Sequence, residues 1–347
     1  MVFRTDASVE IGYGHVMRCL TLADHLKNYK ITIQFVCRKA KGDCIELIRN
    51  KGFVVAELPE IDEDIWSYTN ENWAIDADQT IQAINHQNIN ALIIDHYAID
   101  EKWERKLYSW TNKMMVIDDI ANRKHLCDIL LDQNDYVKGA ERYNLLVPSN
   151  CKLLLGVNYC LLRNEFIKQR RNLKPKNSNV NDVLVSFGGS DPTDETTKVL
   201  QALLIFKDKQ VHVVVGKGNM NSERIKNFCE RHSNYHYYYQ INNIAEVMNK
   251  CDIAIGAGGS STWERCSLGI PSLVVAAAQN QIELSMDADE KKVIKFLGLA
   301  HEITIMDWQR QIQKFIKNIS LRSEIVNNSL NLVDGIGVKR TVKELLS

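Results

Sequence analysis

The sequence predicts an α/β protein made of two halves, each with its own parallel sheet. Short apolar runs alternate with helical patterns along the chain, and this alternation is typical of strands connected by crossover helices. A polar segment interrupts the alternation near the middle of the chain, and the pattern then starts again. The length of 347 residues is enough for about two domains of ordinary size.

The first half shows the alternation of strands and helices clearly. Its predicted strands are 31–36, 53–55, 91–95 and 114–118, and its predicted helices include 15–27 and 73–86. Two of these strands end in an aspartate, at Asp95 and Asp118. Because polar groups at the carboxyl ends of parallel strands line the ligand crevice, we expect a ligand site at this edge of the sheet.

The second half follows a basic, polar stretch at 168–181 that contains Pro175. We interpret this stretch as a solvated connector, since one short charged run in a neutral chain is a poor candidate for binding nucleic acid. The predicted strands beyond it are 183–187, 211–215, 236–239, 252–255 and 272–276. The predicted organisation is an N-terminal domain at 1–165, a linker at 166–181 and a C-terminal domain at 182–347, with the ligand in a cleft between the domains.

Charge and composition argue against several classes of function. The 43 basic residues balance the 43 acidic ones, so we expect no nucleic-acid partner and no polybasic contact with a membrane. No apolar run approaches the roughly 20 residues of a membrane span, and the first residues lack the basic start and apolar run of a signal peptide. The nine cysteines are odd in number, with no C-x-x-C pair, so we expect reduced thiols in a cytoplasmic protein without a metal site.

The first of three glycine-containing segments runs from Asp6 to Arg18. It leaves a short first strand, turns at Gly12 and Gly14, and opens a helix with His15 in its first turn. A helix N-terminus disfavours a positive charge, which favours the neutral imidazole that a general base needs. The alternative is an ordinary turn with a capping histidine.

The second segment, 185–194, leads a buried strand into Gly188 and Gly189, and we expect a helix to begin after Asp191 or Pro192. This arrangement presents backbone N–H groups to an anion. A Gly-Gly pair is common in such turns. The segment is neither a Walker loop nor a GxGxxG fingerprint, which argues against a P-loop ATPase and a dinucleotide-dependent dehydrogenase.

The third segment, 253–266, leads another buried strand into glycines and then into hydroxyl residues at a helix start. Gly259, Ser260 and Ser261 suit a diphosphate, and Glu264, one turn further on, is placed to accept hydrogen bonds from ribose hydroxyls. The alternative for Glu264 is a solvated charge or a partner of Arg265.

Two amide side chains follow the next predicted strand. Asn280 and Gln281 come shortly after the strand at 272–276, where they are able to read the edge of a sugar or a base. Because the same half also has two anion-binding glycine turns, a nucleoside diphosphate is the ligand that it predicts.

Five motifs, found in order along nearly the whole chain, resemble a known family. They are Asp6-x-Ser8-x-x-Ile11-Gly12-x-Gly14-His15, Asp95-His96-Tyr97, Leu130-Leu131-Asp132-Gln133-Asn134, Phe187-Gly188-Gly189-Ser190-Asp191 and Asn280-Gln281. Together they resemble the UDP-2,4-diacetamido-2,4,6-trideoxy-β-L-altropyranose hydrolases of pseudaminic acid biosynthesis. The Gly-x-Gly-His opening combined with Asp-His-Tyr is specific, whereas the glycine turns are shared with many GT-B glycosyltransferases. The second half also resembles the UDP-GlcNAc transferase of peptidoglycan synthesis.

The resemblance implies a GT-B architecture, in which two Rossmann-like domains with parallel sheets face a central cleft and the C-terminal domain holds most of the UDP. It implies that water attacks the anomeric carbon with inversion, which releases UDP and the free diacetamido trideoxy sugar, without a cofactor. The implied catalytic residue is His15, which activates or orients the water. The implied substrate-binding residues are Asp6, Gly12, Tyr13, Gly14, Asp95, Tyr97, Asn134, Gly188, Gly189, Gly259, Ser260, Ser261, Glu264, Asn280 and Gln281.

Two other functions fit the same motifs. A GT-B glycosyltransferase would move the sugar from UDP to an acceptor, but transferases that act on lipids usually carry an apolar, basic docking patch, and we find none in the first half. A non-catalytic nucleotide-sugar binding protein would not need a base beside the anomeric carbon, so His15 distinguishes this alternative from an enzyme.

The remaining polar candidates are expected to have structural roles. His96 is expected to orient the turn between Asp95 and Tyr97, and His125 to pack beneath the cleft. The adjacent acids Asp118 and Asp119 more often solvate or cap a loop than hold a cation.

Overall fold

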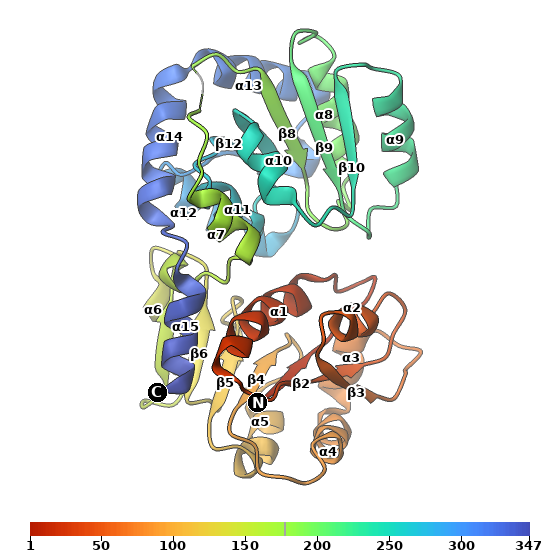
Figure 1. Cartoon of the computed structure of the whole chain (residues 1–347), viewed down its shortest axis with the longest axis vertical. Coiled ribbons are helices and arrows are strands. Elements are labelled where there is room, and N and C mark those ends of the chain that lie inside the picture. The colour runs from red at the N-terminus through yellow and green to blue at the C-terminus, as the bar shows by residue number, and fades with distance from the viewer. Residues whose placement is uncertain (177) are drawn as a thin grey trace. The chain divides into compact units, whose positions relative to one another are not determined.

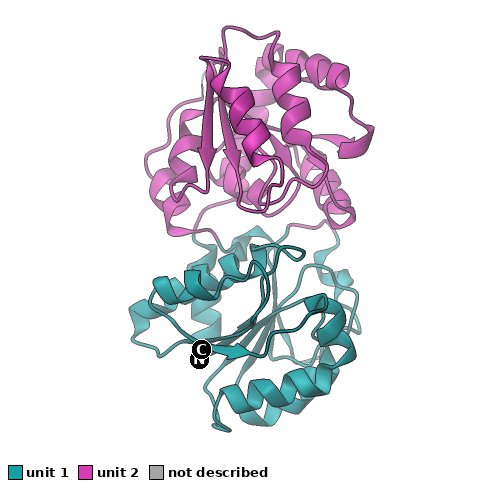
Figure 2. Ribbon diagram, turned by 90° about the vertical axis from the view of Figure 1, so that its right-hand side faces the viewer, with its two compact units in different colours: residues 1–134, 138–161, 336–347 teal, residues 135–137, 162–335 magenta. Residues whose placement is uncertain are grey.

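The computed structural model describes residues 1–176 and 178–347, and each half of the chain contains one parallel sheet flanked by helices (Figure 1). The chain divides into two compact units, which Figure 2 shows in different colours. Unit 1 comprises residues 1–134, 138–161 and 336–347, and unit 2 comprises residues 135–137 and 162–335.

Unit 1 is built on a seven-stranded sheet in the order β3-β2-β1-β4-β5-β6-β7, with every neighbouring pair parallel. The strands are β1 (Val2–Thr5), β2 (Gln34–Arg38), β3 (Val54–Leu58), β4 (Leu92–Asp95), β5 (Met114–Ile117), β6 (Ile129–Asp132) and β7 (Lys152–Leu155). The central strands β1, β4 and β5 are fully buried, as expected for a parallel sheet that helices cover on both faces. The predicted strands of the first half are confirmed within a few residues, while β6 and β7 were not predicted.

Alternate residues of each strand of unit 1 pack in two separate cores, because successive side chains point to opposite faces of a sheet. Phe3 and Ile93 pack with α1 (Gly14–Leu26), α2 (Ile45–Asn50) and α15 (Gly337–Leu346). Val2 and Leu92 pack with α4 (Trp73–Ala83) and α5 (Glu101–Leu107). The remaining helical elements of this unit are α3 (Ile65–Glu71), α6 (Gly139–Arg142), η1 (Lys27–Tyr29), η2 (Tyr108–Trp110) and η3 (Val157–Tyr159).

Unit 2 is built on a six-stranded parallel sheet in the order β10-β9-β8-β11-β12-β13. Its strands are β8 (Asp182–Ser186), β9 (Gln210–Val215), β10 (Tyr235–Tyr239), β11 (Ile253–Ala257), β12 (Ser272–Ala276) and β13 (Lys295–Leu299). Its helical elements are α7 (Asn164–Arg170), α8 (Glu195–Leu203), α9 (Ser222–Glu230), α10 (Ile244–Lys250), α11 (Ser261–Ser267), η4 (Gln279–Gln281), α12 (Ile282–Glu290), η5 (Ala300–Glu302), α13 (Ile305–Lys317) and α14 (Ile319–Leu332). All five strands predicted for this half are confirmed, and β13 was not predicted.

The strand order of each sheet reverses at one point, and this point positions the candidate site. In unit 1, β1 lies between β2 and β4, and in unit 2, β8 lies between β9 and β11. Ligands of open parallel sheets bind beyond the carboxyl ends of the two strands at such a reversal. The segments that leave β1, β4, β8 and β11 there include His15, Tyr97, Gly188 and Ser260.

The boundaries of the two units differ from the prediction in two places. The stretch at 166–181, predicted as a solvated linker, begins inside α7 and packs on unit 2 where it is described. Its cations bond to carbonyl oxygens, with Arg170 donating to Ser267 and Leu330, and Lys176 donating to Asn249 and Cys251. The last residues, 336–347, belong to unit 1 and not to the C-terminal domain, because α15 packs on α1.

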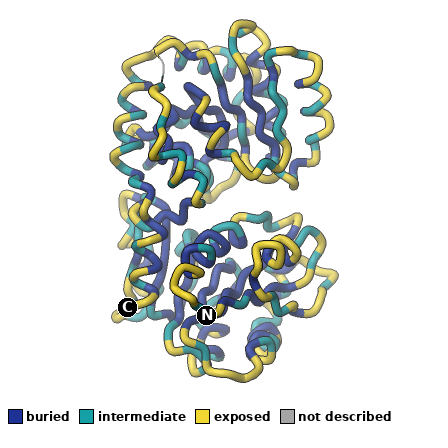
Figure 3. The backbone as a smooth tube through the Cα atoms, viewed as in Figure 1, coloured by how far each residue is buried: buried dark blue, intermediate teal, exposed yellow. Residues whose placement is uncertain are grey.

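The strands of both sheets are largely buried, as Figure 3 shows. None of the helices in the described part of the chain is long and apolar enough to span a bilayer. All nine cysteines are free, and Cys127 and Cys151 place their sulfur atoms 3.6 Å apart.

Candidate functional site

The segment between β1 and α1 is a compact turn that delivers His15 to the carboxyl edge of the sheet. Gly12 donates its N–H to the carbonyl of Ser8 at 3.0 Å, and the Ser8 hydroxyl accepts the N–H groups of Glu10 and Ile11. Gly12 has φ of +76°, a conformation that favours glycine. The helix begins at Gly14, so His15 lies in its first turn as predicted.

His15 forms a dyad with the aspartate that ends β4. Its Nδ1 lies 2.6 Å from Asp95 Oδ1, and the carboxylate is fully buried while the imidazole is 7% exposed. Because a carboxylate only accepts, Nδ1 carries the proton and Nε2 carries the lone pair. The structure gives Nε2 no hydrogen-bond partner within the described residues. This is the arrangement of a general base whose tautomer is set by a carboxylate.

Arg18, one turn further along α1, holds the carboxylate of the dyad in place. Its Nε and NH2 donate to Asp95 at 2.6 and 2.7 Å, and its NH1 donates to Asp119 at 2.8 Å. Burial alone would raise the pKa of Asp95, but Arg18 and then His15 outweigh it, so the pKa falls well below its usual range. Asp95 is therefore ionised at neutral pH and able to stabilise an imidazolium on His15.

Two aromatic rings enclose the imidazole. Tyr97 meets it edge-on with ring centroids 4.4 Å apart and donates its hydroxyl to Asp119 at 2.5 Å. Trp66 of α3 lies 6.4 Å from His15 and 5.4 Å from Tyr97, between ring centroids. The indole Nε1 of Trp66 is buried and has no hydrogen-bond partner within the described residues.

Sequence reasoning missed Trp66, Arg18 and Asp119 as members of this group. Trp66 lies two residues after the acidic run 62–64, and Asp64 caps its helix by accepting the N–H of Ser67. A large aromatic residue at a helix start was the available signal for Trp66. For Arg18, the signal was its spacing of one helical turn from His15.

Asp6 was predicted to bind substrate, but the structure places it in a buried charge network. It lies 2.7 Å from Arg4, 3.2 Å from His96, and accepts the backbone N–H of Arg38 at 2.6 Å. Asp76 neutralises both arginines at 2.8 and 2.7 Å. The carboxylate of Asp6 is thus occupied by protein donors, which fits a role in shaping the turn before His15.

The other predicted residues of unit 1 lie near the same edge of the sheet. Tyr13 is half-buried at the start of α1, and Asn134, which follows β6, is buried and donates its N–H to Asp132 at 3.0 Å. His96 accepts the N–H of Ala98 at 3.2 Å, as expected for a residue that orients this turn. His125 is buried against Glu104 at 2.6 Å.

Unit 2 contains a cavity of about 290 Å³ at the carboxyl ends of β8, β11 and β12. It is lined by Phe187, Gly188, Gly189, Ser190, Pro192, Ala257, Gly259, Ser260, Ser261, Ala277, Ala278 and Gln281. These residues come from both predicted glycine turns and from the segment that carries the amides. The cavity therefore brings together the three parts of the second half that were predicted to bind one ligand.

Close packing of backbone explains the glycines around this cavity. Gly188 has φ of +84°, and a Cβ on Gly256 would lie 2.2 Å from the carbonyl oxygen of Ser186 on the neighbouring strand. The helix predicted after Asp191 begins at Glu195, because the Asp191 carboxylate accepts the N–H groups of Glu195 and Thr196 at 3.0 and 2.9 Å. The first hydrogen bond of the α11 segment joins the N–H of Thr262 to the carbonyl of Gly259.

Three of the residues that line this cavity have backbone N–H groups without acceptors among the described residues. The N–H groups of Gly259, Ser260 and Ser261 precede the first hydrogen bond of the turn and have no acceptor in the described part of the chain. Such groups require an anion or water. Phosphate oxygens satisfy that requirement.

Two predicted residues of unit 2 lie away from the lining of this cavity. Glu264 accepts two hydrogen bonds from Arg163, at 3.1 and 2.8 Å, so its partner is Arg163 and not Arg265. Asn280 is exposed on η4. Gln281 lines the cavity, and its side-chain oxygen accepts the N–H of Ala277 at 3.0 Å.

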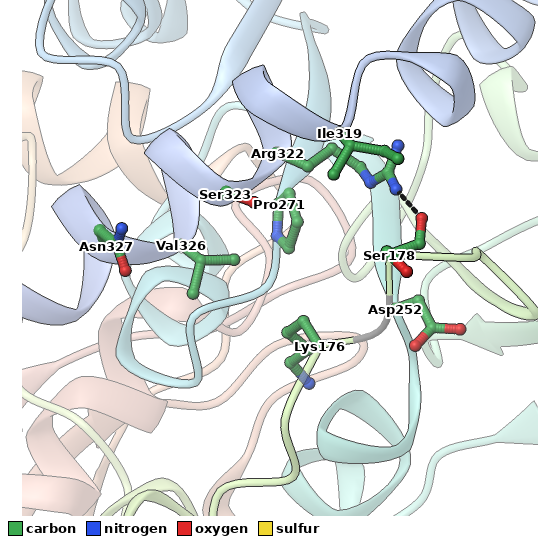
Figure 4. A pocket seen from close by; sticks show the side chains of 9 residues that line it. All are labelled: Lys176, Ser178, Asp252, Pro271, Ile319, Arg322, Ser323, Val326 and Asn327. Atoms are coloured by element: carbon green, nitrogen blue, oxygen red, sulfur yellow. Dashed lines mark hydrogen bonds between the residues drawn. The ribbon is translucent and has the colours of Figure 1, made fainter.

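A second cavity in unit 2, of about 220 Å³, lies at the opposite ends of the strands (Figure 4). It is lined by residues that include Lys176, Asp252, Pro271 and Arg322. The ammonium of Lys176 is directed away from the guanidinium of Arg322 in Figure 4. Both cations bond to backbone carbonyls, so their charges do not converge on one ligand.

No group of three or more His, Cys, Asp or Glu side chains among residues 1–176 and 178–347 is arranged to hold a metal ion. The adjacent acids at the end of β5 bond to protein cations. Asp118 accepts from Arg123 at 2.9 Å, and Asp119 accepts from Arg18 at 2.8 Å.

Comparison with solved structures defines the class of fold. MurG of Acinetobacter baumannii is 10% identical, with a TM-score of 0.65 over 100% of this chain and 98% of that chain. A ugt transferase of Siraitia grosvenorii, solved with UDP, is 12% identical, with a TM-score of 0.61 over 100% of this chain and 99% of that chain. The protein therefore has the GT-B fold of these glycosyltransferases, with two Rossmann-like units.

Comparison of sequences defines the relatives more closely. The Glycosyltransferase family 28 C-terminal domain matches residues 183–320. The UDP-2,4-diacetamido-2,4,6-trideoxy-beta-L-altropyranose hydrolase of Campylobacter jejuni is 28% identical over 81% of this chain and 93% of its own. The spore coat polysaccharide biosynthesis protein SpsG of Bacillus subtilis is 25% identical over 96% of this chain and 94% of its own. The resemblance to the hydrolase family that the motifs predicted is confirmed.

Two further relatives are longer than this chain. An uncharacterized protein of Methanocaldococcus jannaschii is 29% identical over 84% of this chain, which spans 58% of that protein. A Helicobacter pylori protein named as both a pseudaminic acid cytidylyltransferase and the same hydrolase is 25% identical over 60% of this chain, which spans 38% of that protein.

Proposed function

We propose that this chain hydrolyses UDP-2,4-diacetamido-2,4,6-trideoxy-β-L-altropyranose to UDP and the free sugar, with inversion at the anomeric carbon. The observation that carries the proposal is the dyad of His15 and Asp95, which leaves Nε2 of the imidazole with a lone pair and no hydrogen-bond partner among the residues that the structure describes. The named function of the Campylobacter jejuni relative supplies the substrate.

His15 would act as the general base. Its Nε2 takes a proton from water as the water oxygen forms a bond to C1, and the bond from C1 to the diphosphate oxygen breaks with its electron pair leaving on UDP. The imidazolium that forms lies against the ionised carboxylate of Asp95, 2.6 Å from Nδ1. A positioned base of this kind contributes about 10²–10⁴-fold to a rate.

Unit 2 would hold the leaving group. The glycine turns at Gly188–Gly189 and Gly259–Ser261 line one cavity, and the second presents N–H groups without acceptors. Preorganised donors of this kind stabilise the charge that develops on a departing diphosphate. Gln281 lines the same cavity. Glu264 and Asn280 lie outside the cavity lining, and they are proposed to contact the ribose or the sugar of the bound substrate.

The sugar would lie against the aromatic rings of unit 1. The substrate carries two acetamido groups and a methyl group, which present apolar patches and carbonyl acceptors. Tyr97 and Trp66 supply the apolar surface beside His15, and Trp66 Nε1 supplies a buried donor that has no partner within the described chain. Tyr13, Gly12 and Gly14 are proposed to complete this side of the substrate site.

We further propose that the reaction is a step of pseudaminic acid biosynthesis in the cytoplasm. The name of the Helicobacter pylori relative joins the same hydrolase to a pseudaminic acid cytidylyltransferase. The nine cysteines, which we expect to be reduced, support a cytoplasmic location.

A glycosyltransferase is the alternative, and the match of residues 183–320 to a glycosyltransferase domain favours it. The two functions differ in the acceptor. Incubation of the protein with the UDP-linked diacetamido sugar alone should release UDP. NMR of the same reaction identifies the anomer of the free sugar that appears first. Release of UDP that depends on an added acceptor would establish a transferase, and binding without turnover would establish a binding protein.

The role of His15 is tested by H15N. This variant should bind UDP with nearly the affinity of the parent protein while its turnover falls by about 10²–10⁴-fold. An equal loss of UDP binding and turnover would make His15 a structural residue. Excess chelator should leave the activity unchanged, and loss of activity in chelator would refute a metal-free mechanism.

A further inference from the structure

Arg265 of α11 is a buried cation without a carboxylate partner. Its side chain is 1% exposed, and no carboxylate oxygen lies within ion-pair distance of it in the described part of the chain. The other fully buried arginines, Arg4 and Arg38, are both neutralised by Asp76. Burial of an uncompensated charge is costly, so the position of Arg265 requires an explanation.

The neighbouring carboxylate favours this charge from a distance but forms no ion pair with it. Glu264 is adjacent in sequence, but it accepts two hydrogen bonds from Arg163. The guanidinium of Arg265 instead donates to the carbonyl of Ala257 and to the hydroxyls of Ser261 and Thr262, at 3.0, 3.1 and 3.1 Å. All three acceptors are neutral, and Nε of Arg265 has no partner among the described residues.

The acceptors of Arg265 place its charge directly behind the wall of the larger cavity. Ala257 and Ser261 both line that cavity. The guanidinium also packs against Gly256, where a Cβ would lie 3.2 Å from NH1 of Arg265. Burial lowers the pKa of Arg265 to about 10, so the guanidinium still carries its charge at neutral pH.

We propose that Arg265 is the counter-charge for the diphosphate of a nucleoside diphosphate ligand, acting from behind the loop of Ala257 to Thr262. It holds the loop through its hydrogen bonds, and an anionic ligand in the cavity adds the counter-charge that no ion pair within the described residues supplies. The inference rests on the nucleotide part of the proposed function. It makes Arg265 a positioning residue that never touches the ligand.

The test compares UDP with uridine, which lacks the diphosphate. We expect R265Q to bind UDP roughly tenfold to hundredfold more weakly than the parent protein, with uridine affinity unchanged. Gln retains one amide that is able to donate to Ala257 or Ser261, so the comparison isolates the charge. R265K, which keeps the charge but not the planar geometry, should retain most of the preference for UDP over uridine.

A matched control is available in the same unit. Arg322 is 4% exposed, donates to the carbonyl of Phe315, and also lacks a carboxylate within ion-pair distance among the described residues. R322Q should lower the stability without changing the ratio of UDP affinity to uridine affinity. Isothermal titration calorimetry gives both affinities, and circular dichroism gives the folded fraction.

The outcomes separate this inference from the proposed function. Failure of the parent protein to bind UDP would refute both. If R265Q binds UDP and its ratio of UDP affinity to uridine affinity equals that of the parent protein, only the role of Arg265 is overturned. A ratio that falls as far in R265K as in R265Q would also overturn it, because the charge would then not be the cause.

Discussion

Replacement of Asp95 by asparagine tests the dyad most directly. Asp95 accepts from His15 Nδ1 at 2.6 Å and from two nitrogens of Arg18 at 2.6 and 2.7 Å. The amide of D95N turns one acceptor oxygen into a donor, so at least one of these N–H groups loses its acceptor in either orientation of the amide. When the amide nitrogen faces His15, the ring takes the opposite tautomer and its Nε2 no longer accepts a proton from water.

The size of the effect follows from the charge that is lost. Two unit charges about 4 Å apart interact by about 4 kcal/mol at an effective dielectric constant of 20. Loss of that stabilisation from the imidazolium in the transition state corresponds to about 10³-fold in turnover. We expect kcat of D95N to fall by about this factor, while UDP affinity, which depends on unit 2, stays near that of the parent protein.

D119N is the matched control. Asp119 also bonds to Arg18, at 2.8 Å, and accepts from Tyr97, and its charge acts on His15 as well as on Arg18. Both variants remove one carboxylate from Arg18, so they carry a similar cost in stability, measured by urea denaturation. Steady-state kinetics should show a far larger loss in D95N. Equal turnover of the two folded variants would refute the assignment of Asp95 to the tautomer of His15.

Three further predictions concern the sugar side, the pH dependence and the cavity. W66F keeps the aromatic ring but removes the buried N–H donor, so KM for the diacetamido sugar should rise about 3- to 10-fold with UDP affinity unchanged; an unchanged KM would exclude this hydrogen bond. Burial and then Asp119 raise the pKa of Asp132 to about 7, above its unfolded value, so the folded state loses stability as pH rises from about 4 through about 7. D132N should remove that loss. Urea denaturation at pH 5 and pH 8 should therefore show that the free energy of unfolding of D132N gains on that of the parent protein as the pH rises, by at most about 4 kcal/mol. A Cβ at Gly256 would lie 2.2 Å from Ser186 O, so G256A should lower the free energy of unfolding by about 1–3 kcal/mol; an unchanged denaturation midpoint would contradict the tight packing of β8 and β11.

The fold was predictable from the sequence because its central strands are buried on both faces. The runs at 91–95 and 183–187 are mostly apolar, and they form β4 and β8 at the strand reversals. The short strands β6, β7 and β13 were missed because their pairing depends on neighbours distant in sequence. The linker prediction was wrong because composition does not show that Arg170 and Lys176 find carbonyl oxygens on unit 2.

The candidate site was predictable where one segment carries both the turn and the functional side chain. His15 and Ser260 lie within such segments, so local pattern was sufficient to single them out. Trp66 belongs to α3 and reaches His15 only through tertiary packing. The carboxylate of Asp6 likewise interacts with Arg4 and His96. A local sequence pattern does not predict a buried ion pair of this kind.

The return of α15 to unit 1 has a consequence for how the chain matures. Val338, Val342 and Leu345 belong to the same core as Phe3, so the first strand and the last helix complete one hydrophobic interior. During synthesis, unit 2 is a nearly continuous stretch that has all its strands before residue 336 is made. The core of unit 1 stays incomplete until residues 336–347 have been made. Removal of residues 336–347 should therefore leave unit 1 prone to aggregation while unit 2 still folds.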